Sequence, residues 1–275
     1  MVVDVHTHVF PPEIIEKRES IAAGDKRFAA IYSDVRAKMA DGKALTQYMA
    51  EQGINAAVAV GFPFRDNGLI SLANDYVVEL ARHDGSIVPF AAVNTADRRA
   101  ALSEAERCLK NGARGVGELA YYDTGFGEKE RIELEELGHF LEEENAILMM
   151  HLNEQVGHHY PGKMRADFTE VARFIESVPR LQFVLAHMGG GICFYELMPE
   201  IKEAFSNVYY DLAAVPFLYS SALYKFAEGF LADKVLFGSD FPLLTLARYR
   251  PQIDALSEKA REHFLHGNAR RLLGS

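Results

Sequence analysis

Short runs of apolar residues alternate with longer stretches of helical periodicity along the whole chain. Each short run is continuously apolar, which is typical of a parallel strand buried on both faces. The stretches between them place apolar residues at helical spacing. We expect eight strands, at about residues 2–8, 56–60, 87–93, 114–119, 146–151, 181–187, 208–212 and 235–240.

The expected helices follow the strands one by one. Alternating strands and helices predict an α/β fold with a parallel sheet, and eight units favour a (β/α)8 TIM barrel over an open doubly wound sheet. No glycine-rich dinucleotide fingerprint follows the first strand, which also counts against the open sheet. The predicted helices cover residues 45–52, 72–83, 100–111, 132–144, 168–178, 219–231 and parts of 253–273.

Two segments are long for connections inside such a barrel, at about residues 11–44 and 153–167. Long connections in compact domains are usually lids or binding loops, so we expect lid insertions at both places. Within the first, residues 28–39 are compatible with a helix or with part of a hairpin. No linker divides the chain, and we expect one domain over residues 1–275.

Composition narrows the class of protein. The chain has 275 residues, 49% of them hydrophobic and 25% charged, a balance typical of soluble globular proteins. Its formal net charge of -10 argues against nucleic acid or an anionic membrane as a partner. With only Cys108 and Cys193, neither a disulfide framework nor a cysteine zinc site is expected. We see no leader or transmembrane segment, and expect a cytoplasmic protein with a small-molecule substrate; a homo-oligomer remains open.

The first strand ends in a pair of histidines, His6 and His8. Residues two apart on a strand point to the same face, so the two imidazoles project together. Three later apolar runs also end in a metal-ligand type of residue, at His151, His187 and Asp240. In a (β/α)8 barrel the carboxyl ends of all strands meet on one face, which would bring these five side chains together.

Imidazole and carboxylate ligands suit a divalent metal, zinc first, with manganese and iron as alternatives. Such a metal would lower the pKa of a bound water from about 15.7 to around 7 and so supply hydroxide at neutral pH. We expect Asp240 to exchange a proton with that water. His187 is expected to polarise a carbonyl group or to stabilise developing charge.

These motifs resemble those of the amidohydrolase superfamily, in the branch that includes decarboxylases of the aminocarboxymuconate-semialdehyde type. The matching segments extend from the first strand to the last helix. They are Asp4-Val-His6-Thr-His8, His151 at the end of the fifth strand, Leu185-Ala-His187-Met-Gly-Gly, Leu236-Phe-Gly-Ser-Asp240-Phe-Pro242 and Gly267-Asn-Ala-Arg-Arg-Leu-Leu273.

The resemblance implies that His6, His8, His151 and Asp240 hold one divalent metal and that His187 acts on the substrate. Glu118, in Gly117-Glu118-Leu119, is similar to the glutamate that bridges two metals in TatD-type hydrolases. It is either such a bridge or a carboxylate that supports a ligand histidine. The eighth-strand motif is unlike that of TatD, so one ion is favoured over two.

Candidates for contact with the substrate are Arg65, Lys163 and His158, the first two for an anionic group. Tyr121, Tyr122 and Tyr160 could line a pocket.

The leading prediction is a metal-dependent hydrolase that opens a C–N, C–O or lactone-type bond of a small molecule. The alternative is a metal-dependent non-oxidative decarboxylase of the aminocarboxymuconate-semialdehyde decarboxylase type. A barrel that binds metal without turnover is a third reading, and the presence of both Asp240 and His187 argues against it.

Overall fold

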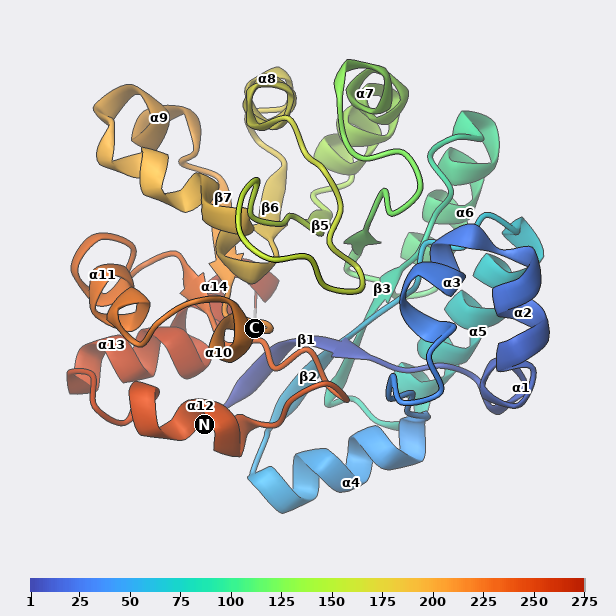
Figure 1. The fold of residues 1–275 in the computed structure, drawn as a ribbon, viewed down its shortest axis with the longest axis horizontal. Coiled ribbons are helices and arrows are strands. Elements are labelled where there is room, and N and C mark those ends of the chain that lie inside the picture. The colour runs from blue at the N-terminus through green and yellow to red at the C-terminus, as the bar shows by residue number, and fades with distance from the viewer. Residues whose placement is uncertain (275) are drawn as a thin grey trace.

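The computed structural model describes residues 1–274, and in it eight parallel strands form one sheet in chain order (Figure 1). Each strand pairs with the next along the chain, as expected when a helix returns the chain after every strand. The strands are β1 (Val3–His8), β2 (Ala56–Val60), β3 (Ile87–Ala91), β4 (Gly115–Leu119), β5 (Ile147–Met150), β6 (Gln182–Leu185), β7 (Val208–Asp211) and β8 (Val235–Leu236).

The sheet closes on itself through the residues that follow β8. The amide of Val5 donates to the carbonyl of Phe237 at 2.9 Å, and the amide of Asp240 donates to the carbonyl of His6 at 2.9 Å. Thr7 also forms a parallel bridge with Phe241. The predicted (β/α)8 barrel is confirmed.

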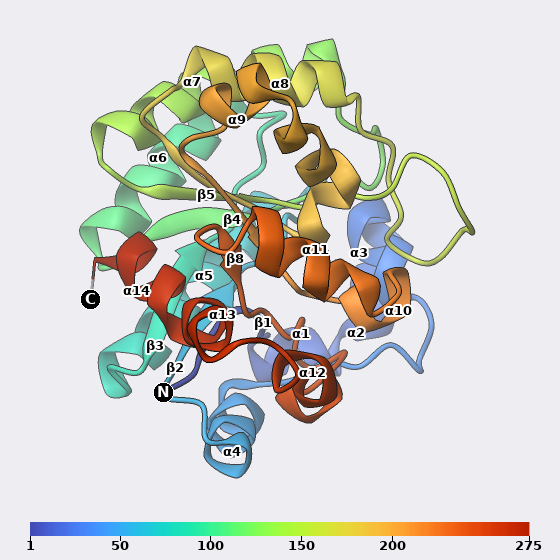
Figure 2. The same cartoon turned by 90° about the vertical axis from the view of Figure 1, so that its left-hand side faces the viewer.

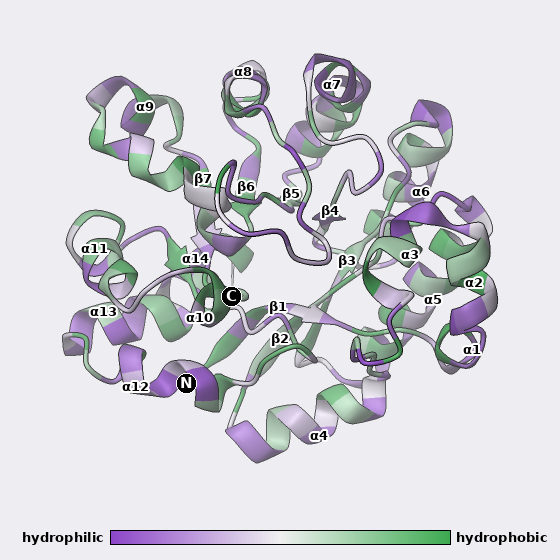
Figure 3. Ribbon diagram, viewed as in Figure 1, coloured by the Kyte–Doolittle hydropathy of each residue, from purple (hydrophilic) through white to green (hydrophobic). Residues whose placement is uncertain are grey.

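The barrel has an inner core and an outer core. Along β2, Val58 and Val60 belong to a cluster that collects residues from six strands, whereas Ala57 and Ala59 belong to the larger cluster shared with the helices. This alternation follows from the two-residue period of a strand. Hydrophilic residues are interspersed with hydrophobic ones along the outer helices, which leaves each helix an apolar side for the sheet (Figure 3).

The predicted helices are present, and some begin earlier than expected. The helix predicted from residue 72 begins at Asn67, because the Asp66 carboxylate accepts from the amide of Leu69 at 2.9 Å and caps the helix. The six helices are α4 (Gly42–Gln52), α5 (Asn67–His83), α6 (Arg98–Lys110), α7 (Glu128–Glu143), α8 (Phe168–Ser177) and α11 (Ala222–Phe230).

Several short helices lie in segments for which the sequence analysis predicted no helix or left the structure undecided. Three of them fill the first long segment: α1 (Pro12–Glu16), α2 (Arg18–Gly24) and α3 (Lys26–Tyr32), so its undecided part begins as a helix. The others are η1 (His187–Leu197), α9 (Pro199–Ala204), α10 (Val215–Leu218) and α12 (Leu246–Ile253). The predicted terminal helices are α13 (Glu258–Glu262), η2 (His263–Gly267) and α14 (Asn268–Leu273).

One end of the barrel carries the extra segments. Figure 2 shows α3, α10 and the loop between β5 and α8 on one side of the molecule, with α14 on the opposite side. In Figure 1 that loop passes over the centre of the ring of helices. Among residues 1–274, every helix is too short or too polar to cross a membrane.

Candidate metal centre

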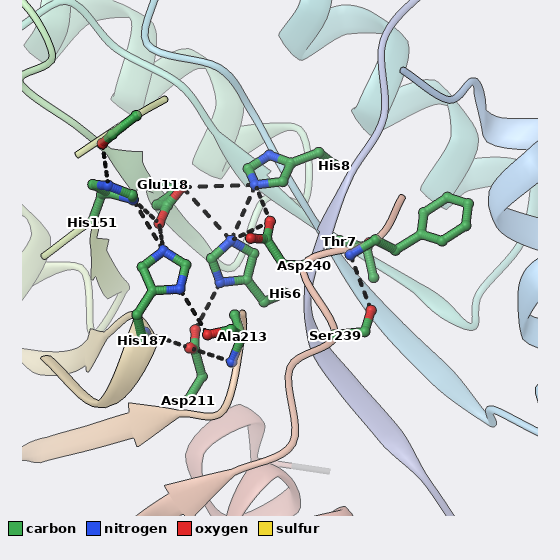
Figure 4. Close-up of polar contacts among 12 residues, drawn as sticks. His6, Thr7, His8, Glu118, His151, His187, Asp211, Ala213, Ser239 and Asp240 are labelled. Carbon is green, nitrogen blue, oxygen red and sulfur yellow. Dashed lines mark hydrogen bonds and ion pairs between the residues drawn. The ribbon is translucent and has the colours of Figure 1, made fainter. Parts of the chain in front are cut away.

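Three donor atoms meet where β1 and the segment after β8 lie side by side. Nε2 of His6 lies 3.1 Å from Nε2 of His8, and Oδ1 of Asp240 lies 3.8 Å and 3.3 Å from these two nitrogens (Figure 4). Their spacing would allow all three to contact one ion. We call His6, His8 and Asp240 the first donor group.

Glu118, at the end of β4, lies between this group and a second one (Figure 4). Its Oε2 is 3.6 Å from Nε2 of His6 and 3.7 Å from Nε2 of His8. Its Oε1 is 2.9 Å from Nδ1 of His151 and 3.4 Å from Nε2 of His187. One carboxylate therefore contacts four imidazoles that come from β1, β5 and β6.

Glu118, His151 and His187 form the second donor group, in which Nδ1 of His151 is 3.1 Å from Nε2 of His187. The resemblance implied that four residues hold one metal, but in the structure these four lie in two separate groups. His151 lies with His187 and Glu118, whereas His6, His8 and Asp240 lie together. Glu118 is the residue that joins the two groups.

Hydrogen bonds fix which ring nitrogen faces the centre in three of the four histidines, His6, His151 and His187. Nδ1 of His6 donates to Oδ2 of Asp211 at 2.8 Å, and Nδ1 of His187 donates to the Ala213 carbonyl at 2.9 Å. Nε2 of His151 is 3.1 Å from the Gly162 carbonyl. Each ring therefore turns its other nitrogen, with its lone pair, toward the centre, as metal-ligating histidines do.

The sequence analysis missed Asp211, which is fully buried at the end of β7. Its Oδ2 accepts from His6, and its Oδ1 accepts from the amides of His187 and Ala213 at 2.8 Å and 3.0 Å. The rule that found His151 and Asp240, a polar residue ending an apolar strand, applies to Asp211 as well.

The backbone turns sharply at two of these side chains. His187 has φ of 57° and Asp240 has φ of 59°, in the left-handed region that residues with a Cβ rarely adopt. Such strained residues are frequent at functional sites, where the surrounding structure enforces them. At Gly190, with φ of 60°, a Cβ would come within 2.4 Å of the Asn153 backbone, so only glycine lets η1 approach this loop.

The electrostatics of the centre favour added positive charge. Burial by itself lowers the pKa of His6, but the carboxylates of Glu118 and Asp211 raise it well above its usual value. For His187, burial is likewise outweighed, mainly by Glu118, and its pKa rises to about 9. Burial raises the pKa of Asp240, but His8, His6 and His187 bring it down to about 2.

These residues fit a divalent cation. Nitrogen and oxygen atoms 3.1 to 3.8 Å apart in the first donor group, together with Oε2 of Glu118, can surround one ion at about 2.0–2.2 Å. The inward lone pairs and carboxylate oxygens repel one another unless a cation or protons lie between them. The set contains no sulfur ligand and is therefore compatible with zinc, manganese or iron.

A cavity of about 650 Å³ opens above both groups. His8, Glu118, His151, His187 and Asp240 lie on its floor. One wall is aromatic: the rings of Tyr32 and Phe62 are 5.6 Å apart, those of Phe62 and Tyr122 are 6.1 Å apart and nearly parallel, and Tyr122 meets His151 at 5.1 Å. The lining also includes apolar side chains, those of Ala214, Phe217, Leu218, Pro242 and Leu243.

Only one of the three predicted substrate-binding residues lines the cavity. His158 lines the cavity, whereas Arg65 and Lys163 are not among its lining residues. The Arg65 side chain is about half exposed and lies 3.7 Å from Asp123, and the Lys163 amine donates to the Val156 and His158 carbonyls. Both cations thus have partners elsewhere, and we assign them no contact with a substrate.

Of the three tyrosines named from the sequence, Tyr122 and Tyr160 line the cavity. Tyr121 does not; it is buried and its hydroxyl is 3.2 Å from the Thr95 hydroxyl. Residues of the two long segments reach the cavity, among them Tyr32 from the first and Tyr160 from the second.

Solved structures of similar fold include aromatic acid decarboxylases. A 5-carboxyvanillate decarboxylase from Novosphingobium aromaticivorans, complexed with manganese and 4-hydroxy-3-methoxy-5-nitrobenzoic acid, matches with a TM-score of 0.78 and 16% identity over 100% of this chain and 96% of that one. A 2,6-dihydroxybenzoate decarboxylase from Rhizobium matches with a TM-score of 0.70 and 18% identity over 99% and 98%. At such identities the likeness shows a shared fold.

These comparisons correct the leading prediction and leave the identity of the metal open. Hydrolysis is wrong as the leading prediction, because the structural neighbours with a named activity are decarboxylases, which agrees with the alternative. Decarboxylation ranked second in the sequence analysis because Arg65 and Lys163 were the only candidates for binding a carboxylate, and because the chain has no tryptophan to build a pocket for the ring. Zinc is not specifically supported either, since the metal named in the neighbours is manganese.

A search of curated protein sequences gave no match. A family model described as amidohydrolase matches residues 3–275, which is nearly the whole chain and includes every residue of both donor groups. The chain belongs to the amidohydrolase family.

Proposed function

We propose that this protein is a metal-dependent non-oxidative decarboxylase of a small aromatic acid. The observation that carries the proposal is that both donor groups line a cavity together with the aromatic side chains of Tyr32, Phe62 and Tyr122. These rings and the apolar residues of the lining would contact the ring of the acid, and its carboxylate would face the donor groups. The decarboxylases of similar fold support the same reaction class.

The first donor group and Oε2 of Glu118 would hold the ion. When bound, the ion would supply positive charge that attracts the anionic acid and orients it over the donor groups. Zinc and manganese both suit the two imidazoles and two carboxylates.

The charges of the buried side chains favour a centre that holds one divalent ion and one proton. Three carboxylates contact the imidazole rings of the centre: Glu118, Asp211 and Asp240. One divalent ion and one proton balance them, whereas two divalent ions leave an excess of buried positive charge. The facing nitrogens of His151 and His187, 3.1 Å apart, would share that proton.

His187 would then be the proton donor of the reaction. Its Nε2 lines the cavity floor, and its Nδ1 is held by the Ala213 carbonyl. The ring carbon that carries the carboxylate accepts a proton, the bond to the carboxylate carbon breaks, its electron pair restores the aromatic ring, and carbon dioxide leaves. The predicted exchange of a proton between Asp240 and a metal-bound water belongs to hydrolysis and has no place in this reaction.

The test is a set of aromatic acids given to the manganese-loaded and the zinc-loaded protein. 2,6-Dihydroxybenzoate, 5-carboxyvanillate and 2-hydroxybenzoate are the first choices. We expect one carbon dioxide per acid consumed, and in heavy water one deuterium at the vacated ring carbon. A product set without carbon dioxide, or no turnover of any aromatic acid by either metal form, would overturn the proposal.

A further inference from the structure

Tyr32 places a hydroxyl group without a protein partner beside the candidate centre. It is the last residue of α3, in the first long segment, and its side chain lines the cavity although the residue is only 6% exposed. Within residues 1–274 no hydrogen bond to its hydroxyl is found, and the Arg18 side chain donates to its backbone carbonyl instead. The residue is buried but its hydroxyl keeps some exposed area, so water or a ligand in the cavity can complete the hydrogen bonding of that group.

The Tyr32 ring is held in place on several sides. It contacts the rings of Phe28 at 4.8 Å, Phe10 at 5.2 Å and Phe62 at 5.6 Å. Its carbonyl accepts from Nε of Arg18 at 2.7 Å. Because both ring and backbone are fixed, the position of the hydroxyl is set before any ligand binds.

The hydroxyl can act only as a neutral donor near this centre. Burial, followed by the charges of Asp240 and Glu118, raises the pKa of Tyr32 above its usual value. The group therefore stays protonated at neutral pH. The best partner for it in the cavity is an oxygen atom of the ligand, preferably one that carries negative charge.

We propose that the Tyr32 hydroxyl donates a hydrogen bond to an oxygen substituent on the ring of the bound acid, which makes Tyr32 a specificity-determining residue for hydroxylated aromatic acids. The inference rests on the proposed function.

The departing carboxylate is a poor candidate for the same hydrogen bond. The carboxylate loses its negative charge when it becomes carbon dioxide, so a donor to it would stabilise the bound acid more than the transition state and would slow the reaction. A donor to a ring hydroxyl or phenolate has no such cost, because that oxygen remains on the product.

The test compares Tyr32→Phe with the parent protein, both loaded with manganese, by calorimetric titration of three acids. The acids are benzoate, 2-hydroxybenzoate and 2,6-dihydroxybenzoate. A hydrogen bond to an uncharged oxygen is worth about 0.5–1.5 kcal/mol and one to a charged oxygen about 1.5–3 kcal/mol, so we expect affinity for the two hydroxylated acids to fall by about threefold or more. Affinity for benzoate should change by less than about twofold, since it has no ring oxygen.

Tyr195→Phe is the matched control, because Tyr195 is 52% exposed and does not line the cavity. It should bind all three acids as the parent does. Should Tyr32→Phe fail to fold, a crystal structure of the manganese-loaded parent with 2,6-dihydroxybenzoate gives the answer. The Tyr32 oxygen should lie within about 3 Å of a ring oxygen.

Three results would overturn the inference. The first is equal affinity of the Tyr32→Phe and parent proteins for every acid. The second is a loss of affinity for benzoate as large as that for the hydroxylated acids, which would place the hydrogen bond on the carboxylate. The third result is a crystal structure in which the Tyr32 hydroxyl points away from the bound acid. If no acid binds the parent protein at all, the proposed function itself fails. If the acids bind the parent but Tyr32→Phe changes nothing, only the inference about Tyr32 fails.

Discussion

Asp211 accepts a hydrogen bond from Nδ1 of His6 at 2.8 Å, although 205 positions separate the two residues along the chain. Both side chains are fully buried. The contact fixes the orientation and the tautomer of the His6 ring, and so decides that Nε2 is the atom presented to a cation.

We therefore predict that Asp211→Ala weakens metal binding without displacing a direct ligand. Removal of such a supporting carboxylate typically costs about 10–100-fold in metal affinity or activity. Competition with a chromophoric chelator for manganese or zinc would measure the loss. Asp233→Ala is the control, because Asp233 is exposed and its contact, His263, lies outside the centre. An affinity equal to that of the parent would contradict the role given to Asp211.

The second prediction concerns the number of ions. After loading with manganese and removal of excess metal, elemental analysis should find one ion per chain, because one ion and one proton balance the three carboxylates. Glu118→Gln removes one of these charges and should lower metal affinity by about tenfold or more, whereas the exposed Glu176→Gln should not. Two tightly bound ions per chain would show that Glu118 is a bridge instead.

The third prediction is a pH dependence of the metal-free protein. The pKa of His187 is raised from its model-peptide value of 6.5 to about 9 in the folded state. The folded state then binds a proton that the unfolded chain releases, so the contribution of His187 to stability is fully present below pH 6.5 and is lost as pH rises through about 9. The full loss is on the order of 3 kcal/mol, at about 1.36 kcal/mol per pKa unit.

Urea unfolding of the chelator-treated protein between about pH 6 and pH 10 would measure this loss. His187→Gln should flatten the decline, because glutamine does not titrate in this range. A stability that rises over this interval in the parent would contradict the prediction.

The fourth prediction compares two glycines with the same backbone conformation. Gly53 and Gly190 have φ of 67° and 60°, but a Cβ at Gly53 meets no atom within 4 Å, while at Gly190 it would meet the Asn153 backbone at 2.4 Å. Gly53→Ala should cost only the left-handed conformation, about 1–2 kcal/mol of unfolding free energy. Gly190→Ala should cost clearly more and should weaken binding of 2-hydroxybenzoate, since Asn153 lines the cavity. Equal costs by urea titration would contradict this.

The sequence predicted the strand framework because a buried parallel strand requires a continuous apolar run, which is a local signal. The strand-end rule also brought His6, His8 and Asp240 into one place, as the structure has them. Which ring nitrogen of His151 faces inward depends on the Gly162 carbonyl, which the folding of the loop between β5 and α8 brings back to that side chain. The resemblance to two-metal hydrolases did offer a grouping of His151 with His187 beside Glu118, but no local pattern favours it over a single set of four ligands.

Tyr32 was missed for a related reason. It lies in a segment of mixed charged and apolar residues where no period is clear, and its position depends on packing against Phe10, Phe28 and Phe62. Side chains from insertions reach a site by tertiary contacts alone. Such residues have to be found in three dimensions, and they are often the ones that distinguish one substrate from another.

The hydrogen bond from the Asp240 amide to the His6 carbonyl joins the beginning of the chain to its last quarter, and the first donor group lies on that junction. During synthesis the two histidines emerge long before the aspartate, so a complete cation pocket can form only after nearly the entire polypeptide has left the ribosome. Ion capture would then be a late event in maturation and would hold together the two ends of the sheet that meet last.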